Sequence, residues 1–251
     1  MNVCHWKLVC GVCFFLLCIS QIAWAGENRD KSDWFQSASS AYSRGDYKTA
    51  IEKFESLSRA GVSAPLLYNL ANSYAQDGQS GRAILNYERA LRLASGDSDI
   101  RGNLELIRTE QGLFQEEKSF VQSFVTFLGL NQWIALATIA FVLFAVVLLL
   151  PISLGLKRIP RLVVATACLL VTTGSILAAA GSYQHWHDGV VVVDNARLRV
   201  SPFASAASIG TIQEGRVLHM GKEHGNYFLV EDETGRSGWL AADTFESIAN
   251  F

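Results

Sequence analysis

The chain has 251 residues, half of them hydrophobic, and a formal net charge of −2 at pH 7. Residues 26–131 carry 12 basic and 14 acidic side chains, and residues 183–251 carry 5 and 9, so neither region has the basic surface of a nucleic-acid-binding protein. Each region is long enough for one small domain, and neither can hold the core of a large enzyme.

Residues 1–25 have the pattern of a secretory signal peptide. Lys7 supplies the positive charge, an apolar stretch follows, and Ala23-Trp-Ala25 provides the small residues of a cleavage site. We expect cleavage before Gly26; an uncleaved anchor helix is the alternative, because the apolar run is long. Cleavage removes four of the five cysteines and leaves Cys168. The exported domains then have no disulfide or thiol, which excludes thiol-based redox catalysis there.

Residues 31–110 show an internal period of 33 residues, in which Gly45 recurs as Gly78 and Ala50 as Ala83. Small residues at such positions let two helices pack closely, and a glycine suits the turn between them. The pattern resembles the tetratricopeptide repeat, a helix–turn–helix unit of similar length. We therefore expect an all-α solenoid of two repeats with a capping helix, because two repeats seldom bury enough surface alone.

The concave face of such a solenoid is built mainly from the first helix of each repeat and is the usual binding surface. Six residues fall on this face and form the candidate groove: Phe35, Ser39, Tyr42, Tyr68, Asn72 and Gln76. Asn72 matches a position at which related repeats often clamp a peptide, but the basic residues of the carboxylate-binding versions are absent. Phe35 and Tyr68 can equally be packing residues, so both interpretations stay open.

Residues 111–131 form an amphipathic connector. Its apolar stripe consists of Phe120, Phe124, Phe127 and Leu128. Such a stripe predicts either a helix that lies on the outer leaflet of a membrane or one that packs beneath the repeats.

Residues 132–182 contain two uncharged apolar runs, 133–152 and 162–181. Each run is long enough for a helix that crosses a hydrocarbon layer about 30 Å thick. The connecting loop, 153–161, carries three positive and no negative side chains, which predicts a cytoplasmic position. We therefore predict a transmembrane hairpin with its turn in the cytoplasm and both flanking domains on the outer side, which in a bacterium is the periplasmic side of the inner membrane.

Residues 189–248 consist of short apolar runs that alternate with turn residues, which predicts an all-β domain. The spacing of the runs and the ending Gly235-Arg-Ser-Gly-Trp239 resemble bacterial SH3-like barrels. The expected core consists of Leu198, Val200, Ile209, Val217, Val230 and Leu240. The resemblance places Tyr227 and Trp239 on an exposed aromatic binding face, while a buried tryptophan is the alternative for Trp239.

The sequence contains no recognisable catalytic motif. His185 and His187 offer two metal ligands, which alone make a poor site, and no nucleophile, zinc-protease or phosphate-binding motif occurs. We therefore expect a protein that is not an enzyme and that needs no metal or cofactor.

The complete order of elements is signal peptide, tetratricopeptide repeats, membrane hairpin and SH3-like domain, with Asn103-Leu-Glu-Leu106 just after the repeats. This order resembles the E-type proteins of the bacterial aerotolerance (Bat) operon. The resemblance implies a non-enzymatic membrane component that works beside membrane proteins with von Willebrand A-type domains and, indirectly, a MoxR-type AAA+ ATPase. It also implies a role in oxygen or stress tolerance of the cell envelope.

Two main functions follow as hypotheses from the sequence. In the first, the protein is a membrane-anchored scaffold whose repeats bind a protein partner while the SH3-like domain adds a second contact and hence avidity. In the second, the SH3-like domain binds peptidoglycan, and the protein anchors to or senses the cell wall. A hydrolase with an unrecognised site is a third hypothesis.

Overall fold

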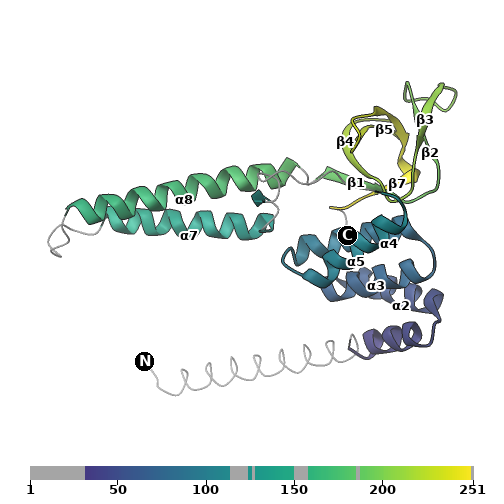
Figure 1. Cartoon of the computed structure of the whole chain (residues 1–251), viewed down its shortest axis with the longest axis horizontal. Helices are drawn as coiled ribbons and strands as arrows, with labels where there is room; N and C mark the ends of the chain where they lie inside the picture. Colours follow the sequence, from purple (N-terminus) through teal and green to yellow (C-terminus); the bar gives the residue numbers. More distant parts are fainter. Residues whose placement is uncertain (1–31, 114–123, 126–127, 150–157, 185–186, 250–251) are drawn as a thin grey trace, which may run out of the picture. The chain divides into compact units, whose positions relative to one another are not determined.

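The structure, a computed structural model of the chain, describes five stretches (Figure 1): 32–113, 124–125, 128–149, 158–184 and 187–249. The predicted signal peptide with its cleavage site, most of the predicted connector, and His185 lie outside these stretches. The chain divides into two compact units, Met1–Val62 and Ser63–Phe251.

The described part of the first unit is a pair of helices, residues 32–43 and α2 (Tyr47–Ala60). The turn between them contains Gly45 at a φ of 78°, a value that favours glycine. Asp46 caps α2, because its carboxylate accepts a hydrogen bond from the Thr49 backbone N–H at 3.3 Å. The two helices meet where the ring of Phe35 packs edge-on against Phe54, with centroids 5.5 Å apart.

The second unit begins with three helices, α3 (Ala64–Gln76), α4 (Ser80–Leu93) and α5 (Ser98–Glu110). Gly78 in the α3–α4 turn has a φ of 80°, so the two glycines of the 33-residue period have nearly the same backbone conformation. Ser63 and Asp97 supply side-chain N-caps for α3 and α5. The buried hydrophobic residues of these helices are Leu66, Leu67, Leu70, Ala71, Tyr74, Ala83, Ile84, Leu85, Tyr87, Ala90, Ile100, Leu104 and Ile107.

The next two helices, α7 (Leu130–Leu149) and α8 (Arg158–Gln184), lie side by side (Figure 1). Both are long and apolar enough to cross a membrane. Their contact buries small residues such as Ala140, Ser175 and Ala178. The helix α8 begins at Arg158, so residues 158–161 are helical and not part of the loop predicted for 153–161. Residues 153–157 lie outside the described stretches.

One described part of the predicted connector packs against the ends of this hairpin. The Phe124 ring lies 5.3 Å from that of Trp133, and the Val125 carbonyl accepts hydrogen bonds from Trp133 Nε1 at 3.0 Å and Ser182 Oγ at 3.3 Å. These contacts join the residues before α7 to the last turns of α8.

The C-terminal part of the second unit is a seven-stranded antiparallel sheet. Its strands are β1 (Asp188–Val191), β2 (Ala196–Arg199), β3 (Ser208–Ile212), β4 (Val217–His224), β5 (Tyr227–Asp232), β6 (Ser237–Ala241) and β7 (Phe245–Ser247), with the short helix η3 (Ala242–Thr244) before β7. The strand order is β3-β2-β6-β5-β4-β1-β7, and the sheet curls around its own core (Figure 1). An all-β region is thus present, as predicted, and its strands span residues 188–247.

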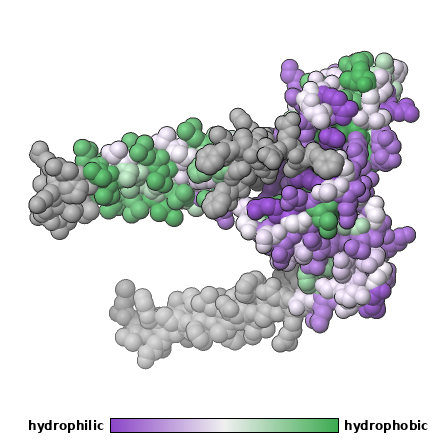
Figure 2. All heavy atoms as spheres, viewed as in Figure 1, coloured by the Kyte–Doolittle hydropathy of each residue, from purple (hydrophilic) through white to green (hydrophobic). Residues whose placement is uncertain are grey.

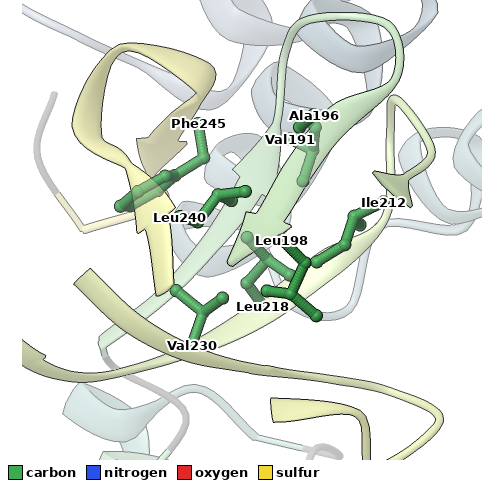
Figure 3. Packing of buried hydrophobic residues seen from close by; sticks show 8 residues of the cluster. All are labelled: Val191, Ala196, Leu198, Ile212, Leu218, Val230, Leu240 and Phe245. Carbon is green, nitrogen blue, oxygen red and sulfur yellow. The ribbon is translucent and has the colours of Figure 1, made fainter. Parts of the chain in front are cut away.

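The core of the curled sheet consists of eight side chains (Figure 3): Val191, Ala196, Leu198, Ile212, Leu218, Val230, Leu240 and Phe245. The prediction was right for Leu198, Val230 and Leu240. It was wrong for Val200 and Ile209, each of which is 55% exposed. The pairing register shifts between Leu198 and Arg199, so Ile209 has no partner in β2 and the inside–outside alternation is reversed beyond that point.

Candidate binding surfaces

The three candidate groove residues of the first unit share one face of helix 32–43, because they are spaced four and three residues apart. All three are half-buried. Phe35 packs on Phe54, and Tyr42 packs on Tyr47 with ring centroids 5.5 Å apart. The Ser39 hydroxyl donates to the Phe35 carbonyl at 3.0 Å. The aromatic members of this set therefore stabilise the helix pair while keeping part of their surface exposed.

The candidate groove residues of the second unit lie on α3, and two of them join a polar cluster. Asn103 Nδ2 on α5 donates to Asn72 Oδ1 at 3.1 Å and to Tyr68 Oη at 3.0 Å. The Tyr87 hydroxyl on α4 also donates to Asn72 Oδ1. Asn72 Oδ1 thus holds three helices together. Its amide nitrogen, which carries two N–H donors, has no hydrogen-bond partner among the described residues.

Gln76, the last residue of α3, is exposed and takes no part in this cluster. Sequence reasoning missed Tyr87 and Asn103 as neighbours of Asn72. In the sequence, Asn103 is recognisable only as part of the motif that follows the repeats, and no spacing indicates its contact with Asn72 on a different helix.

The two candidate residues of the β-domain have a common neighbour, His224. Tyr227 pairs with His224 across the β4–β5 hairpin. The ring of Trp239 lies 6.3 Å from that of His224, which in turn lies 6.1 Å from Phe203, both in T-shaped arrangements. Trp239 is half-buried and is not a member of the sheet's core cluster. The structure therefore brings both predicted residues to one surface.

The row Phe203–His224–Trp239, here called the aromatic row, extends into the loop between β2 and β3. Phe203 is 57% exposed. The Arg199 guanidinium positions this loop, because its Nη1 donates to the carbonyls of Ala204 at 2.8 Å and Ala206 at 2.9 Å. Phe203 comes from a loop without periodicity, so no sequence pattern indicated that it belongs to this surface.

A histidine–carboxylate pair lies at the start of the β-domain. His219 Nδ1 and Asp188 Oδ1 are 2.6 Å apart, and the Asp188 side chain is only 10% exposed. Hydrogen bonding to Asp188 raises the pKa of His219 above its ordinary 6.5, against the opposing effect of partial burial. The nearby carboxylates of Glu231 and Glu233 also raise it.

Among the described residues, no group of three or more His, Cys, Asp or Glu side chains could hold a metal ion. Cys168 is a half-buried free thiol on α8. Compared with known proteins by sequence, the chain matches no protein-family model and no curated protein.

Proposed function

We propose that the protein is a non-enzymatic scaffold of the bacterial inner membrane, which displays a tetratricopeptide-like helical domain and an SH3-like domain on the periplasmic side. The observation that carries this proposal is the exposed apolar hairpin α7–α8, which in the sequence lies between two folded regions. Figure 2 shows the apolar surface of the hairpin and the largely polar surface of the folded regions. In this account each region offers a half-exposed binding surface, and the hairpin holds both at the membrane.

The hairpin supports the membrane position because its large side chains face outward. Ile139 is 59% exposed and Leu170 is 69% exposed. Exposure of this much apolar surface is unfavourable in water but favourable in the hydrocarbon layer of a membrane. Arg158 and Arg161 at the start of α8 favour a cytoplasmic turn, with α7 beginning and α8 ending on the outer side.

The helical region supports recognition of a protein segment. The matching turn glycines, Gly45 and Gly78, favour two copies of one structural unit. The amide N–H donors of Asn72, which have no partner among the described residues, suit the backbone carbonyls of an extended peptide, and the half-exposed ring of Tyr68 lies beside them. The resemblance to Bat-operon proteins makes membrane proteins with von Willebrand A-type domains the first partners to test.

The aromatic row favours peptidoglycan as a second candidate ligand. Exposed rings beside a hydrogen-bonding imidazole suit sugars and stem peptides better than they suit a flat protein surface. In that case the protein anchors to the cell wall or senses it.

Photo-crosslinking in native membranes tests the scaffold function. A photoreactive amino acid replaces Gln76 in the tagged full chain, and the matched control carries it at Glu105, which is also exposed but lies on α5. We expect Gln76 to capture a membrane protein with an A-type domain that Glu105 does not capture. Identical products from both positions, or none from Gln76, would contradict the scaffold function.

Sedimentation with purified sacculi tests the wall-binding function. The full chain in detergent should pellet with sacculi, and Phe203→Ala should abolish pelleting. Failure of the unmodified protein to pellet removes this candidate.

A further inference from the structure

The helix α4 lacks an N-cap of its own. The side chain of Gln79, at its N-cap position, makes no capping hydrogen bond, whereas α2, α3 and α5 each have a side-chain cap. The missing acceptor comes from the β-domain: Glu214 Oε1 accepts a hydrogen bond from the Gly81 backbone N–H at 2.7 Å. A carboxylate at this position also interacts favourably with the helix dipole.

The contact around this cap leaves no room for side chains at two glycines. A Cβ atom at Gly81 would lie 2.5 Å from both Glu214 Cγ and the Val191 carbonyl oxygen. A Cβ atom at Gly215, which has a φ of 83°, would lie 2.5 Å from Ile84 Cδ1 and 2.8 Å from Leu113 Cδ1. The β3–β4 turn is therefore packed directly onto α4 and the residues after α5.

Polar contacts surround this packed centre. Arg89 Nη2 on α4 donates to the Ser247 carbonyl at 2.7 Å and lies 3.5 Å from Glu246 Oε2. Gln213 Nε2 donates to the Gln111 carbonyl at 2.8 Å, just beyond the end of α5. The Arg89 side chain is only 12% exposed, so its contacts are shielded from water.

We infer that the surface of α4 and α5 around Gly81, Ile84 and Arg89 is the docking site of the chain's own β-domain, and that the two regions fold and act as one body. The docked regions are separated in the chain by α7 and α8. They can meet only if both lie on the same side of the membrane. The chain must therefore cross the membrane an even number of times between them. This docking surface is also closed to other partners.

Hydrogen–deuterium exchange on the full chain in detergent tests the docking. The key variant is Gly81→Ala, because alanine favours a helix but has no room in the docked arrangement. The matched control is Gly102→Ala in α5, where a Cβ atom meets nothing within 4 Å. We expect Gly81→Ala to raise exchange at least tenfold in residues 213–217, far along the chain, and Gly102→Ala to leave it unchanged.

A second variant distinguishes loss of docking from a purely local defect in α4. Glu214→Ala changes the β-domain alone and should raise exchange in the first turn of α4. Unchanged protection of 213–217 in Gly81→Ala, together with unchanged protection of α4 in Glu214→Ala, would overturn the inference. Protection that falls when the unmodified protein is diluted would also overturn it, because the docking would then join two copies of the chain.

Discussion

The Gly81 backbone N–H and the Glu214 carboxylate form a 2.7 Å hydrogen bond although they lie 133 positions apart in the chain. The bond completes the N-terminus of α4 with a side chain that follows the hairpin α7–α8 in the sequence. The stability of α4 therefore depends on a residue that follows it in the chain by three described helices, α5, α7 and α8, and three strands, β1 to β3.

Removal of the carboxylate of Glu214 should destabilise the protein measurably. Glu214→Ala should lower the free energy of unfolding by about 1 kcal/mol, the usual effect of losing an N-cap. Thermal unfolding of the full chain in detergent measures it. Glu223→Ala, at an exposed position on β4, is the control and should have little effect. Equal effects of the two variants would contradict a capping role for Glu214.

The polar cluster on α3, α4 and α5 gives a second stability prediction. Asn103→Ala removes the donor shared by Asn72 and Tyr68 and should lower the free energy of unfolding by about 1–2 kcal/mol. Glu105→Ala, exposed on the same helix, should be nearly neutral. Denaturant unfolding compares the two, and a neutral Asn103→Ala would show that the cluster does not hold the helices together.

The pair formed by His219 and Asp188 predicts a pH dependence. Folding raises the pKa of His219 above 6.5, so the protonated histidine favours the folded state. This contribution is fully present below the unfolded-state pKa and is lost as the pH rises through the folded-state pKa. Stability should therefore fall as the pH rises above about 6.5, and His219→Gln should remove that part of the pH dependence. Thermal unfolding between pH 5 and pH 9 checks it; an unchanged slope in the variant would contradict it.

The aromatic row and the core of the sheet should respond differently to truncation. Phe203 is largely exposed, so Phe203→Ala should change the free energy of unfolding by less than about 0.5 kcal/mol. Leu240 is fully buried, and Leu240→Ala should cost about 2–5 kcal/mol. Comparable losses in the two variants would place Phe203 among the structural residues and not on a binding surface.

The sequence predicted those elements whose signal is local or periodic. The recurrence of Gly45 at Gly78 located the helix pairs, and the uncharged runs located α7 and α8. The prediction of core residues failed where an irregularity in strand pairing reverses the inside–outside alternation of side chains. The shift beside Leu198 leaves Ile209 exposed instead of buried. It also missed the contacts of Asn103 with Asn72 and of Glu214 with Gly81. These join residues on different elements, and no spacing along the chain encodes them.

The most direct test of the account is the accessibility of introduced thiols in spheroplasts. Single cysteines at Arg101 on α5, at Thr234 in the β-domain and at Ser153 between the hairpin helices are treated with a membrane-impermeant maleimide, against the background of Cys168. We expect labelling at 101 and 234 in intact spheroplasts and labelling at 153 only after lysis. If only one of positions 101 and 234 is labelled before lysis, the two domains lie on opposite sides, and the account of a docked, outward-facing scaffold is wrong.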